Sequence, residues 1–205
     1  MAKIKIQKKD IWIDMTPMSD VMVLLLTFFM MSSTFMKKEP TTVTTPMSVS
    51  EIKVPETNVL NILVDSIGRI YMGMDNEHHS VEALLSMAGQ YGVSINPLQR
   101  TAFLEDGMWG MPMDKLEAYL NLDPDARNLA IKQQGGIPLD SIDGGESEFQ
   151  MWVKEARNAN DEIKVAIKAD QNTPYKVIKK IMGELRDMNE NRYYLITSYK
   201  ANQED

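Results

Sequence analysis

The longest apolar stretch of the chain lies near its N-terminus. Of the nineteen residues from Met18 to Met36, only six are polar, and an α-helix needs roughly 20 apolar residues to cross a membrane. The stretch is apolar all round, whereas a surface helix of a soluble domain is apolar along one stripe. We therefore expect a single transmembrane helix over residues 17–37. No A-x-A-like site follows, which disfavours a cleaved signal peptide.

The charges beside this segment predict its orientation. Four lysines precede it and two, Lys37 and Lys38, follow it. The positive-inside bias then places residues 1–16 in the cytoplasm and the remainder of the chain outside it. The net charge is −7, and the part from Glu39 onward is more acidic than the whole, which argues against nucleic acid as a partner.

After the apolar segment comes a stretch rich in Thr, Ser and Pro, residues 38–58, that is typical of an extended linker. Within it, Val49, Ile52 and Val54 precede Pro55. β-branched residues that end on a proline favour a short strand at a sheet edge. Plain linker is the alternative.

A domain with alternating strands and helices follows over residues 59–200, with a short tail at 201–205. The apolar runs 59–65 and 69–73 flank Gly68 and predict a β-hairpin. Residues 80–92 then fit a helix with Ser80 as its cap and Gly92 at its end.

The domain closes with a predicted β-α-β unit. Residues 162–170 alternate as a strand with Ile163, Val165 and Ile167 on one face, and a strand over 192–199 ends the domain. Between them lies a helix capped by Thr173-Pro174, with apolar residues at helical spacing. The fold class is therefore α+β, with one N-terminal transmembrane helix, an extended linker and a sandwich-like α/β domain.

The middle of this domain, residues 77–148, fits no part of that plan and is interpreted as an inserted region of helices and loops. It contains a predicted helix at 113–122, another after Asp123-Pro124, and an acidic loop at 135–148. Its acidic loops lack the spacing of a calcium loop, and its adjacent histidines lack a third ligand. No metal and no cofactor are expected. Trp109 fits core packing better than a partner-facing patch.

Asp20 is the main candidate functional residue, and two interpretations compete. Thr16 and Pro17 resemble a helix N-cap and first position, which would place Asp20 in the first turn, where a carboxylate is favoured. Alternatively, Asp20, Thr27 and Thr34 share one helical stripe at i, i+7 and i+14. Polar groups inside a membrane face protein or water and mark ion pathways. The stripe therefore predicts that other helices enclose this one.

The segment IDMTPMSDVMVLLLTFFMM, residues 13–31, resembles the N-terminal signature of the ExbD/TolR family. Thr16, Pro17 and Asp20 match that signature in order and spacing, as does the Val-Met pair that follows. Asp14 stands where the family often has Asn, and Ser19 replaces what is usually an apolar residue. The closing β-α-β unit is also similar to the extracytoplasmic domain of ExbD.

This resemblance implies a subunit of a proton-driven motor in the bacterial inner membrane, not an enzyme. Asp20 would accept and release the proton, and Thr16 and Pro17 would support it, whereas Thr27 and Thr34 are assigned to the pore by the helical stripe alone. The implied partners are an ExbB/TolQ-like pentamer, a TonB-like energy transducer, a second copy of this chain in a homodimer, and the lipid bilayer. In the family, the strip equivalent to Val49, Ile52, Val54 and Pro55 is associated with docking.

Several functions stay open at this level. The motor would energise TonB-dependent transport across the outer membrane, serve a TolR-like role in envelope maintenance, or drive gliding. A membrane-anchored periplasmic binding module is the alternative from another class. An anchored hydrolase has little support, because the chain has no cysteine and no nucleophile–base pair stands out.

Overall fold

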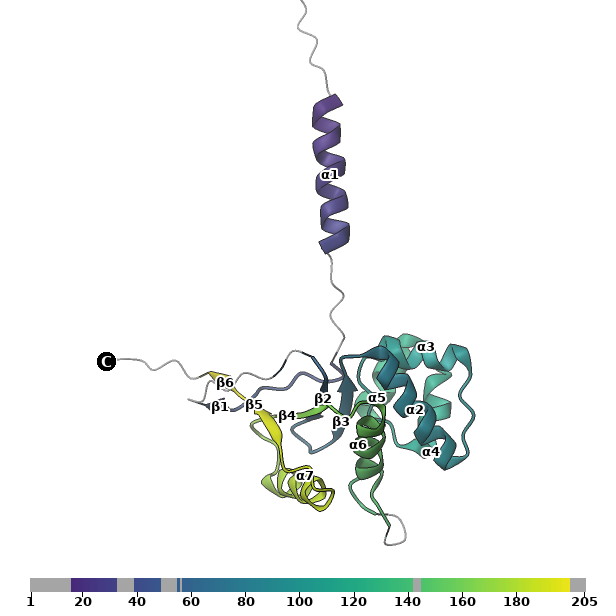
Figure 1. Ribbon diagram of the computed structural model, residues 1–205, viewed down its shortest axis with the longest axis vertical. Coiled ribbons are helices and arrows are strands. Elements are labelled where there is room, and N and C mark those ends of the chain that lie inside the picture. The colour runs from purple at the N-terminus through teal and green to yellow at the C-terminus, as the bar shows by residue number, and fades with distance from the viewer. Residues whose placement is uncertain (1–15, 33–38, 49–54, 56, 142–144, 200–205) are drawn as a thin grey trace, which may run out of the picture. The chain divides into compact units, whose positions relative to one another are not determined.

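The computed structural model describes residues 16–32, 39–48, 55, 57–141 and 145–199 (Figure 1). The chain divides into two compact units, residues 1–36 and residues 37–205.

The first unit contains one helix, α1 (Thr16–Ser32), of 17 residues. None of its side chains is buried, and its large apolar residues are 55–89% exposed. Within the part of the chain that the structure describes, no helix reaches the combined length and hydropathy of a membrane-spanning helix. The predicted segment 17–37 continues beyond Ser32 into residues 33–38, which lie outside the described residues.

The second unit is built on a mixed four-stranded sheet of order β3-β2-β4-β5. Its strands are β2 (Val59–Val64), β3 (Ile70–Met74), β4 (Lys164–Ala169) and β5 (Tyr193–Ile196). β2 pairs antiparallel with β3 and parallel with β4, which in turn pairs parallel with β5. The predicted α+β class, hairpin and closing strands are therefore confirmed.

The turn of the hairpin is held by one buried carboxylate. Asp65 accepts hydrogen bonds from the backbone amides of Ile67 and Arg69 at 2.9 and 2.8 Å and pairs with the Arg69 guanidinium at 2.7 Å. Gly68 has a φ of +94°, a conformation that residues with a side chain rarely adopt. Its predicted place in the turn is confirmed.

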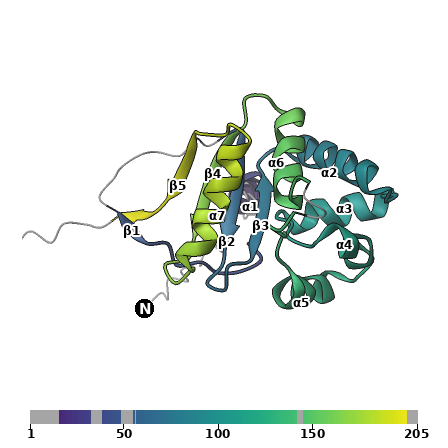
Figure 2. The same cartoon turned by 90° about the horizontal axis from the view of Figure 1, so that it is seen from below.

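Six helices belong to this unit in the described residues: α2 (Glu77–Tyr91), α3 (Pro97–Asp106), α4 (Met113–Leu120), α5 (Pro124–Gln134), α6 (Glu148–Ala159) and α7 (Tyr175–Asp187). α7 connects β4 to β5 and lies across one face of the sheet, where it buries Ile181 and Leu185 (Figure 2). α2 to α6 gather beside β3 (Figure 2). A small parallel pair, β1 (Met47–Ser48) with β6 (Ser198–Tyr199), stands apart from the main sheet.

Two predicted helix caps are corrected by the structure. α2 begins three residues before Ser80, because the Asn76 side chain accepts from the amide of His78 and Ser80 lies inside the helix, where it donates to the Asn76 carbonyl. Thr173 does not cap α7 but donates to the Asp65 carbonyl at 2.9 Å. The predicted end at Gly92 is confirmed, with a left-handed φ of 68°.

The region 77–148 shares one hydrophobic core with the sheet. Trp109 pairs with Met72 through two backbone hydrogen bonds of 2.7 Å, so it covers the outer edge of β3. Its ring lies 5.1 Å from Phe103 of α3 and 5.2 Å from Trp152 of α6. The core position expected for Trp109 is confirmed.

Candidate functional site

Asp20 lies on α1, beyond its first turn. The helix starts at Thr16 and has no acidic residue in that turn, so the cap-like interpretation of Asp20 does not match the helix start. The Thr27 hydroxyl donates to the Leu24 carbonyl at 2.9 Å. This bond satisfies the hydroxyl within its own helix, as commonly happens for threonine, so the pore role of Thr27 stays a prediction.

The other predicted site residues are distributed unevenly over the described chain. Thr16 and Pro17 open α1. Thr34 and three members of the proposed docking strand, Val49, Ile52 and Val54, lie outside the described residues, while Pro55 is described and half-buried. The strand that the structure places nearby is β1, just before Val49, and it pairs with β6 near the C-terminus.

The segment from Glu39 to Ser48, called the strap below, is attached to the domain at several points. Its backbone exchanges hydrogen bonds with the end of β4, where Thr44 donates to the Asp170 carboxylate and accepts from the Gln171 amide, both at 2.9 Å. The Ser198 amide donates to the Pro46 carbonyl at 2.9 Å. Part of the predicted linker is therefore docked on the domain.

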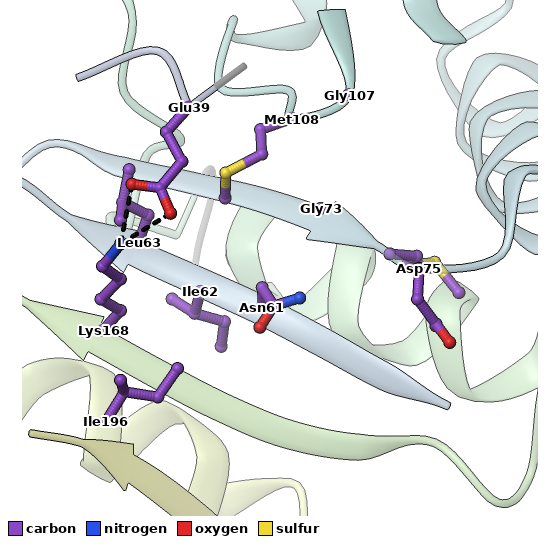
Figure 3. A pocket seen from close by; sticks show the side chains of 11 residues that line it. Glu39, Asn61, Ile62, Leu63, Gly73, Asp75, Gly107, Met108, Lys168 and Ile196 are labelled. Carbon is purple, nitrogen blue, oxygen red and sulfur yellow. Dashed lines mark hydrogen bonds and ion pairs between the residues drawn. The ribbon is translucent and has the colours of Figure 1, made fainter. Parts of the chain in front are cut away.

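The first residue of the strap closes a pocket on the sheet. The Glu39 carboxylate pairs with the Lys168 amine of β4 at 2.6 and 2.8 Å (Figure 3). The cavity beside this pair has a volume of about 310 Å³ and is lined by Asn61, Asp75, Met108 and Ile196, among others. Leu63, Lys168 and Ile196 occupy one register row across β2, β4 and β5.

A close approach at Gly73 forms one wall of this pocket. A Cβ at Gly73 would lie 2.8 Å from Cγ of Met108 and 3.0 Å from the Gly107 carbonyl oxygen. Only glycine lets the loop after α3 approach β3 so closely. The pocket therefore depends on the region 77–148 as well as on the sheet.

A second polar cluster joins α3, α4 and α5. The nearly buried Arg127 guanidinium pairs with Asp106 at 3.1 Å and with Glu105 at 2.9 Å, and the Tyr119 hydroxyl donates to Asp106 at 2.7 Å. Burial raises the pKa of Asp106, although the bonds from Tyr119 and Arg127 oppose this shift. Because these groups satisfy one another, we interpret the cluster as a structural clamp between helices.

Glu148 is a buried acid at the first position of α6. Its carboxylate accepts a hydrogen bond of 3.1 Å from the Met113 amide at the start of α4. Burial raises its pKa to about 7; the bond from Met113 opposes the shift, and the charge of Asp114 adds to it.

This pKa predicts a pH-dependent stability. Between about pH 4.3 and pH 7, the unfolded chain is ionised at Glu148 while the folded chain keeps the proton, so the free energy of unfolding falls as pH rises through this range. Glutamine keeps an oxygen acceptor without the charge. On going from pH 5 to pH 8, we expect the free energy of unfolding of the wild type to fall by on the order of 2 kcal/mol more than that of Glu148→Gln.

Urea unfolding of both proteins at the two pH values measures this difference. Glu146→Gln is the matched control, because Glu146 lies two residues earlier with an exposed side chain. If the free energy of unfolding depended on pH equally in Glu148→Gln and in the wild type, the raised pKa of Glu148 would be contradicted.

Together, these features define a class of protein: an apolar helix that carries one acid, followed by an α+β domain with a strap across its sheet. Residues 7–97 match the family model described as biopolymer transport protein ExbD/TolR. This match covers 91 of the 205 residues and supports the assignment of this part of the chain to the ExbD/TolR family. The match ends at Pro97, the first residue of α3, so the rest of α3 and α4 to α7 lie outside it. Comparisons with curated proteins and with solved structures give no match.

Proteins of this family share several general properties. Members are transport accessory proteins rather than enzymes, and they are anchored in the inner membrane. They associate with partners of the ExbB/TolQ type and with TonB-like proteins. The sequence signature therefore identified the family from residues that the match includes.

Proposed function

We propose that this chain is a subunit of an ExbB–ExbD-type motor, driven by the proton-motive force, that energises TonB-dependent transport across the outer membrane. The observation that carries the proposal is the Thr16-Pro17 pair followed by Asp20 on the apolar helix α1, within the family match. In this proposal, Asp20 carries the proton between the two sides of the membrane.

The physical basis is the cost of a charge in an apolar setting. An ionised aspartate at the centre of a membrane helix costs at least about 2.5–3.5 kcal/mol. Asp20 is therefore more stable when it faces protein or water, and when it is protonated part of the time. Protonation then changes which surroundings the helix prefers. This change links proton movement to movement of the helix.

The exposure of α1 supports enclosure by other helices. Its apolar side chains are exposed on every side, and a surface of this kind is covered by lipid or by protein. We assign the cover to a pentameric ExbB/TolQ-like ring and to the same helix of a second copy. Thr27 and Thr34 would line the path of the proton with Asp20, and the chain would cross the inner membrane once with its N-terminus in the cytoplasm.

A membrane-anchored binding module is the second candidate, and the pocket under the strap favours it. In that case α1 would serve only as a tether, and any apolar helix could replace it. A motor subunit instead requires the particular sequence of α1. A TolR-like or gliding motor would also require the particular sequence of α1. It would differ in the partner that the domain contacts.

Copurification with an ExbB-type protein tests the proposal. We expect the full chain to copurify in mild detergent with a coexpressed ExbB-type protein from the same genome. We expect a variant with residues 16–36 replaced by a polyleucine helix of equal length to lose the partner, although it still enters the membrane. Equal recovery of the partner by both chains would favour the tether.

A further inference from the structure

The pocket under the strap has opposite charges at its two ends. Lys168 lies at the level of Leu63 on β2, whereas Asp75 follows Met74, which pairs with Leu60. Asp75 therefore lies at the level of Val59, and its carboxylate accepts from the Asn58 and Val59 amides at 2.8 and 3.2 Å. Four residues of strand separate the two levels, roughly 13 Å.

The groups between these ends suit a peptide backbone. Asn61 lies between Lys168 and Asp75 on the pocket floor (Figure 3), and no hydrogen-bond partner of its side chain is found among the described residues. A side-chain amide offers both a donor and an acceptor, which is what a peptide bond requires. Met108 and Ile196 supply apolar walls.

The strap already places a carboxylate at one end of this pocket. Glu39 reaches Lys168 from a segment of extended chain, and the two side chains are 43% and 26% exposed. An ion pair this open to water is weak, so an incoming carboxylate can replace that of Glu39. Lys168 keeps a partner in either state.

We propose that this pocket binds an extended peptide segment of a partner protein, with an acidic residue at Lys168 and a basic residue four positions away at Asp75, in place of Glu39. Side chains at i and i+4 of an extended chain project from the same face, and their spacing matches the roughly 13 Å between the two ends. A single amino acid is too short to reach both charges. Peptide binding in this pocket does not depend on proton transfer by Asp20.

Binding of short peptides to the full chain in detergent tests this site. The probes are fluorescein-labelled pentapeptides Glu-Val-Thr-Val-Lys and Lys-Val-Thr-Val-Glu, which cover both chain directions, with Gln-Val-Thr-Val-Gln as the uncharged control. Fluorescence polarisation measures the affinity. We expect at least one charged peptide to bind, and to bind about three- to tenfold more tightly to Glu39→Gln, because the competing carboxylate is gone.

Changes at Lys168 then separate a binding role from a structural one. Lys168→Glu should weaken binding of the peptides that contain glutamate and create binding of Lys-Val-Thr-Val-Lys. A misfolded protein would not produce this reversal. Lys179→Gln is the matched control, because Lys179 is an exposed lysine of α7, outside the pocket lining. The proposal is overturned if no charged peptide binds to Glu39→Gln, or if Lys168→Glu leaves the preference unchanged.

Discussion

Proton flux through the assembled motor is expected to fall to background when Asp20 is replaced by asparagine. Asparagine keeps the size and polarity of the side chain but cannot take up or release a proton in the working pH range. The expected effect is large, because α1 contains no other titratable residue between Thr16 and Ser32. The measurement is acidification of proteoliposomes that contain this chain and its ExbB-type partner, followed with a pH-sensitive dye.

Asp14→Asn is the matched control for this experiment. It makes the same chemical change six residues earlier, and we expect it to leave the flux close to that of the wild type. Copurification of the Asp20→Asn chain with its partner checks that the complex still forms. Undiminished flux in the Asp20→Asn complex would rule out Asp20 as the proton carrier.

Truncation of Trp152 to alanine is expected to lower the free energy of unfolding of the domain by about 3–5 kcal/mol, the usual cost of removing a large aromatic side chain from a core. Trp152 is completely buried on α6 and its ring lies 5.2 Å from that of Trp109. Trp109 in turn pairs with Met72 of β3. Loss of the Trp152 ring therefore weakens the junction between α6, the loop after α3 and the sheet.

Chemical denaturation of the full chain in detergent, followed by circular dichroism, measures this loss. Tyr175→Ala is the control, because Tyr175 is also a large aromatic residue on a helix but is 76% exposed, and we expect a change of about 0.5 kcal/mol or less. If the region 77–159 is part of the same cooperative unit as the sheet, Trp152→Ala shifts the whole transition. A separate early transition would show instead that this region unfolds independently.

The elements that the sequence predicted well are those with a strong local signal. β2 and β3 lie at the predicted apolar runs because Gly68 and the buried Asp65 favour the turn between them. α7 carries apolar residues at helical spacing along its buried side, and in β4 the alternation of Val165 and Ile167 predicted the buried face. In each case neighbouring residues contain the information.

Two helices, α3 and α6, were not identified, although their sequences contain usable signals. Asn96 and Gln99 form a capping box before α3, with Pro97 at the first position, and Ser147 and Gln150 form another before α6. This pattern marks a helix start. The cap predicted at Ser80 was wrong for a related reason. Asn76, four residues earlier, is also a good cap, and its side chain accepts a hydrogen bond from the His78 amide.

The two candidate sites differ in how far sequence alone could locate them. Asp20 stands out because an acid in an apolar run, next to Thr16-Pro17, is a local feature. The pocket depends on a pairing between Glu39 and Lys168 that spans 129 positions and on the approach of Met108 to Gly73. Surface lysines and glutamates are common, so nothing in the neighbourhood of either charge indicates its partner.

By itself, the sequence determined the apolar helix, its acid, the ExbD/TolR signature and the strands and helices with clear periodicity, because each depends on residues that are close along the chain. Only the tertiary structure decided the strand order β3-β2-β4-β5, the shared core of Trp109 and Trp152, and the docking of the strap over the sheet. These features arise from contacts between distant segments. Such contacts form when packing selects one of many locally acceptable arrangements.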